Sequence, residues 1–312
     1  MNDPQAIAEA IFSAHAARFG AVAKATDFHF STSSSSTDDA VHGGAKKACA
    51  MLGFIDIDAE CLGSAWSAQT RRNGRFDAEA WPDSPADFGL RSFPPGQRSD
   101  AFPACPDRLG LYAVLPDAQW VGRMARAGVP TVQLRFKSDD AEAVEREVHA
   151  AVAAVQGTGA LLFINDHWRT AIAAGAYGLH LGQEDLDALR PEELQAIRAS
   201  GLRLGVSTHG YAEMLRADLA SPSYLAMGAV YPTTLKRMAT VPQGVARLAA
   251  YARLMRGYPQ VGIGGIDAQR LPEVLATGVG SVAVVRALVA EADPEAAAAR
   301  LVAMVDSTLA GA

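Results

Sequence analysis

Polar side chains gather where short apolar runs of this chain end, and their chemical types suit a site for anions and a metal ion. They are Gln133, Arg135, Lys137, Asn165, Asp166, Asp185, Ser207, Thr233, Thr234, Lys236 and Arg286. Lysine binds phosphate oxygens as a point charge, and arginine binds them through a planar fork. Carboxylates such as Asp166 and Asp185 bind Mg2+, which prefers oxygen ligands. The pattern therefore predicts a pyrophosphate site bridged by a metal ion.

The use of lysine strengthens this interpretation. Beyond residue 106 the chain has only two lysines, Lys137 and Lys236, and each lies just past the end of an apolar, β-rich run. Elsewhere in this part of the chain the cations are arginines, so a compact ammonium at both places points to phosphate. The alternative for Lys137 is that it begins a helix and pairs with Asp139 or Asp140.

From residue 109 onward, the sequence alternates apolar, β-rich runs with helical patterns. The predicted strands are 109–115, 131–136, 161–166, 178–182, 203–209, 224–233, 260–266 and 281–288, with helices such as 141–155 and 243–255 between them. Continuous apolar strands separated by helices imply a parallel sheet covered on its outside. Eight such units predict a (β/α)8 barrel, an α/β fold with its chemistry at the carboxyl ends of the strands. The alternative is an open doubly wound sheet, whose GxGxxG fingerprint is missing here.

Three further features of the strand ends have a chemical and a plain structural interpretation. The run GIGGI at 262–266 leaves backbone amides of Gly264 and Gly265 open to a phosphate, although any tight turn also needs glycine. Asp166 is either a metal ligand or the N-cap of the next helix. His180 follows an apolar run and either orients a neighbour or acts in catalysis, the first being favoured.

Residues 1–106 differ from the rest and predict an N-terminal extension, partly helical and partly irregular, ahead of a barrel at 107–312. Helical patterns cover 5–19, 45–52 and 59–70, whereas 31–40 is a polar low-complexity stretch. All three cysteines, Cys49, Cys61 and Cys105, fall in this region without metal-site spacing. We find no catalytic constellation there.

Composition and charge exclude several classes of protein. Hydrophobic residues make up 49% and charged residues 20%, which is ordinary for a globular protein. The 28 basic and 34 acidic residues give a net charge of −6, which argues against a nucleic-acid or membrane-surface partner. No run resembles a membrane span or a signal peptide, so we expect a cytoplasmic protein acting on small molecules.

Seven ordered motifs, which cover roughly residues 109–305, resemble the thiamine phosphate synthase family. They are QLRFK, FINDHW, GLHLGQEDL, LGVSTHG, GAVYPTTLK with PQG, VGIGGI and VGSVAVVRA. The resemblance implies a (β/α)8 barrel that joins hydroxymethylpyrimidine pyrophosphate to thiazole phosphate and releases pyrophosphate. It also implies Mg2+ as cofactor.

Residue by residue, the resemblance assigns three groups of ligands. Gln133, Arg135, Lys137 and Asn165 would bind the pyrimidine pyrophosphate, with Ser207 and Lys236 completing the pyrophosphate pocket. Asp166 and Asp185 would hold Mg2+. The thiazole phosphate would lie among Thr233, Thr234, Gly264, Gly265, Val285 and Arg286. Lys137, Lys236 and Ser207 are the candidate catalytic residues.

This sequence departs from the family pattern at two positions. Leu235 stands where the family commonly has threonine, and Arg286 stands where it commonly has serine. We expect the Arg286 guanidinium to replace the lost hydroxyls with a charged contact to phosphate.

Two other functions stay open at this point. One is a related thiazole tautomerase, which uses a histidine near the position of His209. The other is a ligand-sensing barrel without catalysis, against which the retention of Asp166 and Asp185 argues.

Overall fold

The structure is a computed structural model that describes residues 3–20, 37–91, 94–233 and 241–311. It separates into two compact units. The first consists of Met1–Phe93 together with Gly210–Arg216, and the second of Pro94–His209 together with Ala217–Ala312. Residues 94–106, which the sequence prediction assigned to the extension, therefore belong to the second unit.

The second unit contains a closed barrel of eight parallel strands, which confirms the predicted (β/α)8 fold and rules out the open sheet. The strands are β1 (Gly110–Leu115), β2 (Thr131–Leu134), β3 (Leu161–Asn165), β4 (Gly178–Leu181), β5 (Arg203–Thr208), β6 (Tyr224–Gly228), β7 (Gln260–Ile263) and β8 (Ser281–Val284). Each strand pairs with the next, and β1 closes the ring by pairing with β8. Because all strands are parallel, their carboxyl ends meet at one mouth.

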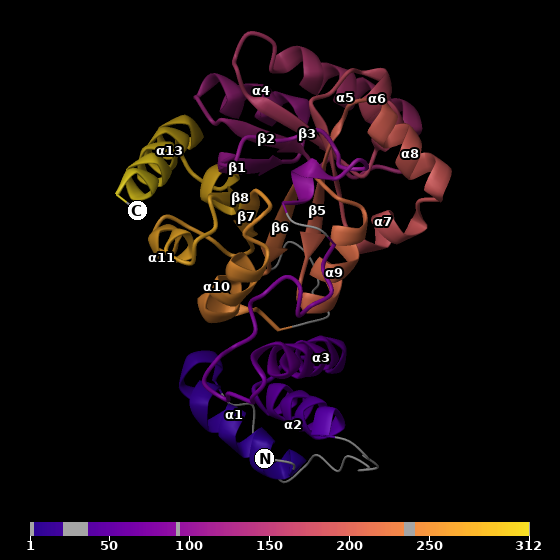
Figure 1. Cartoon of the computed structure of the whole chain (residues 1–312). Coiled ribbons are helices and arrows are strands. Elements are labelled where there is room, and N and C mark those ends of the chain that lie inside the picture. The colour runs from indigo at the N-terminus through magenta and orange to yellow at the C-terminus, as the bar shows by residue number, and fades with distance from the viewer. Residues whose placement is uncertain (1–2, 21–36, 92–93, 234–240, 312) are drawn as a thin grey trace. The chain divides into compact units, whose positions relative to one another are not determined.

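Helices follow the strands and cover the sheet from outside (Figure 1). They are α4 (Ala118–Arg126), α5 (Ala141–Ala154), α6 (Trp168–Ala173), α7 (Gln183–Ala188), α8 (Pro191–Ala199), α9 (Tyr211–Leu219), α10 (Gly244–Leu254), α11 (Leu271–Leu275), α12 (Arg286–Val289) and α13 (Pro294–Ala310). Asp117, Asp140 and Asp293 cap three of them through side-chain oxygens. Asp140 is therefore engaged at the start of α5.

Several strands end earlier than the sequence predicts, and this places the polar residues in loops at the mouth. β6 ends at Gly228 rather than at 233, and β7 ends at Ile263. Gly264 and Gly265 have positive φ angles of 106° and 66°, which no strand tolerates. The apolar runs continue past the ladder because the loops after them are also packed.

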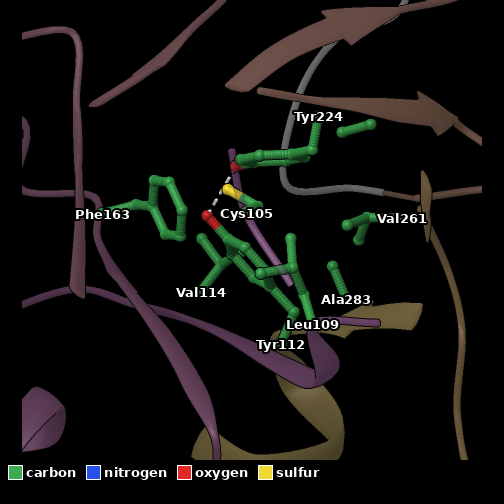
Figure 2. Packing of buried hydrophobic residues seen from close by; sticks show 9 residues of the cluster. Cys105, Leu109, Tyr112, Val114, Phe163, Tyr224, Val261 and Ala283 are labelled. Carbon is green, nitrogen blue, oxygen red and sulfur yellow. Dashed lines mark hydrogen bonds between the residues drawn. The ribbon is translucent and has the colours of Figure 1, made fainter. Parts of the chain in front are cut away.

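Aromatic rings fill the interior of the barrel (Figure 2). Tyr112, Phe163 and Tyr224 are at most 2% exposed and lie against one another, with ring centroids 5.1 to 6.0 Å apart. A Cβ on Gly205 would lie 2.1 Å from the Tyr224 ring, so only glycine makes room for it. Cys105, the last of the three cysteines, packs into the same cluster.

The first unit is helical, with α1 (Pro4–Phe19), α2 (Thr37–Met51) and α3 (Asp56–Asn73). The predicted helices are confirmed, but α2 begins earlier than expected, inside the polar stretch. Here α2 packs closely on α1. A Cβ on Gly44 of α2 would lie only 2.6 Å from the Ile7 side chain of α1, so the contact depends on glycine. Tertiary packing thus extends a segment whose local sequence is a weak helix former.

An aromatic cluster forms the core of this unit, and it contains His15, Phe19, Phe54, Trp66, Trp81, Phe88 and Tyr211. Trp81 Nε1 donates to Tyr211 Oη at 3.0 Å. Asp58 accepts from the amide of Ala212 at 2.9 Å and so binds the first turn of α9. Tyr211 and Ala212 therefore pack as part of the first unit.

All three cysteines carry free thiols. Within the described ranges, none of the helices has the length and apolar character needed to cross a membrane.

Candidate active site

A cavity of about 860 Å³ opens at the carboxyl ends of the strands. Twelve predicted site residues line it: Gln133, Arg135, Lys137, Asn165, Asp166, Asp185, Ser207, Thr233, Gly264, Gly265, Val285 and Arg286. Thr234 and Lys236, with the departure at Leu235, lie outside the described residues. The structure therefore brings together every predicted site residue that it describes, and their individual roles stay predictions.

Two carboxylates and an ammonium group meet at one side of this mouth. Asp166 directly follows β3 and has a left-handed backbone, with φ of 65°. Lys137 donates to its Oδ2 atom. Of the two interpretations of Lys137, the structure shows the ammonium at the site and not on Asp139 or Asp140. The N-cap of α6 is His167, so Asp166 does not have the capping role that was its alternative.

Asp185 lies in the first turn of α7, and its carboxyl faces that of Asp166 closely enough for the two to interact. Partial withdrawal from water and the nearby charge of Asp166 raise the pKa of Asp185 above its ordinary value. Two carboxylates this close repel each other when both are ionised. A cation bound between the two carboxylates would relieve that repulsion. Lys137 donates to Asp166 and so balances the charge of that carboxylate.

The carboxylate pair fits Mg2+ better than a metal that needs a complete protein cage. Among the residues that the structure describes, no group of three or more His, Cys, Asp or Glu side chains forms a metal site. Mg2+ typically binds through one or two carboxylates and takes its other ligands from water and substrate phosphates. Asp166 and Asp185 offer the first part of such a set.

A buried amide borders the cavity next to the charged groups. Gln133 is 3% exposed, and its Nε2 atom has no hydrogen-bond partner within the described part of the chain. Asn165, also buried, lies at the end of the neighbouring strand β3. Because buried donors are nearly always paired, the Gln133 amide is suited to an acceptor on a ligand.

Ser207 is held firmly at the mouth. Its Oγ atom lies 2.8 Å from Nε2 of His180, and its carbonyl accepts from the side-chain amide of Gln183 at 2.7 Å. The sequence prediction favoured an orienting role for His180 over a catalytic one, and it placed neither His180 nor Gln183 among the site residues. The signal for His180 was a polar residue between two leucines in a buried strand.

The glycine turn after β7 forms the opposite side of the mouth. A Cβ on Gly264 would lie 2.5 Å from that of Ala229, so this position accepts no side chain. Arg270 donates to the carbonyl of Gly265 at 2.7 Å, and its guanidinium lies 4.6 Å from the ring centroid of Tyr231. The sequence gives no signal for Arg270, which lies just before α11 and not at a strand end. Arg286 is exposed at the start of α12, beside the same turn.

Comparison with known proteins agrees with this geometry. A family model described as thiamine monophosphate synthase (TMP-TENI) matches residues 111–288. A thiamine-phosphate synthase of Neisseria meningitidis serogroup B is 54% identical over 195 residues, covering 62% of this chain and 94% of the relative. One of Salmonella schwarzengrund is 52% identical over 200 residues, covering 64% and 93%. A solved structure, thiamine phosphate pyrophosphorylase from Pyrococcus furiosus, is similar with a TM-score of 0.58 and 27% identity, over 65% of this chain and 98% of that one.

The matched span runs from β1 into α12, so it contains every strand that forms the mouth. The resemblance carried by the seven motifs is thereby confirmed. The chain belongs to the thiamine monophosphate synthase family.

Proposed function

We propose that this protein is a transferase that joins hydroxymethylpyrimidine pyrophosphate to thiazole phosphate, forming thiamine phosphate and pyrophosphate. The observation that carries the proposal is the meeting of Asp166, Asp185 and Lys137 at the mouth of the barrel. These groups supply what a departing pyrophosphate needs, which is positive charge and a place for a divalent cation. The family relationship supplies the identity of the two substrates.

In this reaction the bond between the pyrimidine methylene and a pyrophosphate oxygen breaks, and the electron pair stays with pyrophosphate. The thiazole nitrogen then forms a bond to the same carbon. Mg2+ held by Asp166 and Asp185 would neutralise the developing charge of the pyrophosphate. Lys137 and Arg135 add fixed positive charge beside it, and Ser207 adds a hydroxyl donor. Lys236 completes this set in the proposal.

In this proposal the buried side-chain amides of Gln133 and Asn165 bind the pyrimidine ring. Gln133 offers an unpaired donor to a ring nitrogen, and Asn165 lies on the adjacent strand. Because these side chains are buried in packed strands, they hold the ring in one orientation while the bond breaks. The reaction then needs positioning and charge more than it needs a nucleophile.

The second substrate binds across the mouth in this proposal. The turn at Gly264 and Gly265 would approach the thiazole phosphate through its backbone. Thr233, Val285 and Arg286 would surround the phosphate, with Thr234 as a further ligand. The two substrates then face each other across the cavity.

The cytoplasm is the compartment in which we place this reaction. The free thiols of Cys49, Cys61 and Cys105 are compatible with a reducing environment. Both substrates are small molecules, in keeping with a cavity of about 860 Å³.

The test is an assay of the purified full chain with both substrates and Mg2+. We expect thiamine phosphate and one pyrophosphate for each turnover, and loss of product when the pyrimidine substrate is omitted. Conversion of the thiazole substrate alone would favour the tautomerase, for which His209 borders the cavity. Tight binding of both substrates without product would favour a ligand sensor and overturn the proposal.

A further inference from the structure

A line of buried polar groups crosses the barrel interior and ends at the mouth. Tyr112 Oη lies 2.8 Å from Tyr224 Oη, which lies 2.7 Å from His180 Nδ1. His180 Nε2 in turn lies 2.8 Å from Ser207 Oγ. Figure 2 shows the contact between the two tyrosines at the centre of the aromatic cluster. We call Tyr112, Tyr224, His180 and Ser207 the hydroxyl relay.

The register of the strands brings these groups together across β5. His180 on β4 and Tyr224 on β6 both pair with Gly205 on β5. Because Gly205 has no side chain, the Tyr224 ring lies over it and reaches the imidazole on the far side. The relay therefore depends on three neighbouring strands whose residues lie far apart in the sequence.

Hydrogen counting gives the relay a direction. A neutral imidazole has one donor nitrogen and one acceptor nitrogen. With the hydrogen on Nε2, Tyr112 donates to Tyr224, Tyr224 to His180 and His180 to Ser207. Every buried donor is then paired, and the Ser207 hydrogen is left to point into the cavity.

The opposite direction leaves a buried hydroxyl without an acceptor. With the hydrogen on Nδ1, Ser207 donates to His180, His180 to Tyr224 and Tyr224 to Tyr112. Within the described part of the chain, the hydroxyl of Tyr112 makes no hydrogen bond other than the one to Tyr224. Because Tyr112 is 2% exposed, its hydrogen would be buried and unpaired, which costs about 1–3 kcal/mol.

We infer that Tyr224 fixes His180 in the tautomer with its hydrogen on Nε2, and that His180 thereby holds the Ser207 hydroxyl as a donor into the cavity. This inference rests on the proposed function, in which that donor meets an oxygen of pyrophosphate. His180 and Tyr224 are positioning residues, since they act on the reaction through Ser207.

Both tyrosines stay protonated, as either direction of the relay requires. Burial raises the pKa of Tyr224 well above its ordinary value and also raises that of Tyr112. Both phenols therefore keep their hydrogens and remain donors throughout the range in which enzymes are assayed.

The first experiment observes the tautomer directly. The full chain labelled with 15N-histidine is studied by NMR, and the signals of His180 are identified by their loss in His180→Gln. We expect the hydrogen on Nε2 in the wild type and a loss of this preference in Tyr224→Phe. A hydrogen on Nδ1, or on both nitrogens, in the wild type would overturn the inference.

The second experiment measures binding of inorganic pyrophosphate with Mg2+ by calorimetry, for Ser207→Ala, Tyr224→Phe and the double variant. We expect each single change to weaken binding by about tenfold, the usual size of a hydrogen bond to a charged group. The double variant should bind no more weakly than Ser207→Ala alone, because both changes remove the same donor. Additive losses, or wild-type protein that does not bind pyrophosphate, would contradict the relay.

Tyr258→Phe is the matched control. This buried tyrosine precedes β7 at the opposite end of the strands, and its hydroxyl donates to Asp218 at 2.6 Å. We expect it to lower the melting temperature and leave pyrophosphate binding unchanged. Loss of binding in this variant would show that any weakening of the barrel has the same effect as Tyr224→Phe.

A second pair of variants applies if Tyr224→Phe does not fold. His180→Gln keeps an amide donor for Ser207 and a carbonyl acceptor for Tyr224, whereas His180→Leu keeps neither. We expect the glutamine variant to bind pyrophosphate more tightly than the leucine variant, and equal binding would refute the role of His180. Wild-type protein that binds pyrophosphate in the expected tautomer but makes no thiamine phosphate would overturn the proposed function alone.

Discussion

Asp166 combines an unusual backbone with the central charge of the site. Its φ of 65° lies in the left-handed region, which aspartate and asparagine enter more readily than other residues with side chains. The conformation turns the chain directly after β3, and Lys137 donates to the carboxylate. The residue therefore serves the turn and the anion site at once.

Replacement of Asp166 by asparagine separates these two roles, because asparagine tolerates the same backbone. We expect Asp166→Asn to fold normally and to release pyrophosphate about 100- to 1,000-fold more slowly, the usual loss for an electrostatic group in an active site. The measurement is pyrophosphate release at saturating Mg2+. Asp139→Asn, an exposed carboxylate outside the cavity, is the control. Turnover near the wild-type rate in Asp166→Asn would rule out the metal assignment.

Arg286 gives a prediction about the second substrate. If its guanidinium binds the thiazole phosphate, Arg286→Ser raises the KM for that substrate by about tenfold, as expected for one charged hydrogen bond. The KM for the pyrimidine pyrophosphate should change little. Steady-state kinetics with each substrate varied in turn make the comparison. An unchanged KM for thiazole phosphate would show that Arg286 does not replace the family's hydroxyls.

At this scale the sequence predicted which residues meet but not how they pair. Polar residues at the ends of parallel strands must share one mouth, so Gln133 and Ser207 were found from their positions alone. The contact between Lys137 and Asp166 was one of several possible ion pairs. The hydroxyl relay depends on the register across β4, β5 and β6, which no single segment encodes.

At the scale of elements, the turn after β7 is set by a close approach of two loops. Gly264→Ala would place a methyl group 2.5 Å from the Ala229 side chain, which forces the turn to move. We expect a large loss of affinity for thiazole phosphate, measured as its KM. Gly278→Ala is the matched control, because Gly278 also has a positive φ but has no atom within 4 Å of the added carbon. If both variants behave alike, backbone strain alone explains the loss.

The N-terminal helices give a prediction about pH. Burial lowers the pKa of His15 below its ordinary value of 6.5, with Arg18 lowering it further and Glu79 and the Ala78 carbonyl opposing. The folded unit therefore binds this proton less readily than the unfolded chain, so protonation destabilises it as the pH falls below 6.5. The melting temperature should fall less between pH 7.5 and about pH 5.5 in His15→Gln than in the wild type.

His149→Gln, which changes an exposed histidine on α5, is the control for this pH effect. It should follow the wild type at every pH. A wild-type pH dependence that survives unchanged in His15→Gln would assign the effect to other groups.

The barrel elements were predicted well because their apolar runs and caps are local signals. The extent of α2 was underestimated for a physical reason. Gly43 and Gly44 weaken the helix locally, yet the second of them allows the close contact with Ile7. A feature that disfavours a helix in isolation thus favours it in the folded unit.

For the molecule as a whole, a buried ion pair ties the segment that begins at Pro94 to the barrel. Arg98 donates to Asp218 Oδ1 at 2.9 Å, and their side chains are 2% and 1% exposed. Arg98 also donates to the hydroxyls of Ser221 and Tyr258. Residues 94–106 therefore hold a partner that the barrel needs.

Two truncated chains test this boundary. One begins at Pro94 and the other at Asp107, so both lack residues 1–93 and differ only in the short segment with Arg98. We expect the shorter chain to be less stable by about 3–5 kcal/mol, because the buried Asp218 carboxylate loses the positive charge of Arg98. Chemical denaturation measures the difference. Equal stability of the two would mean that Asp218 is reached by water or finds another partner.

The contact of Gly205 with the Tyr224 ring also limits how this sequence can evolve. A Cβ at position 205 would meet that ring at 2.1 Å, so a larger residue there requires a smaller one at 224. A smaller residue at 224 removes the hydroxyl that faces His180. Positions 205 and 224 are therefore expected to change together and not singly. A relative that differs at one of them should also differ at the other and should fill the interior of its barrel with different side chains.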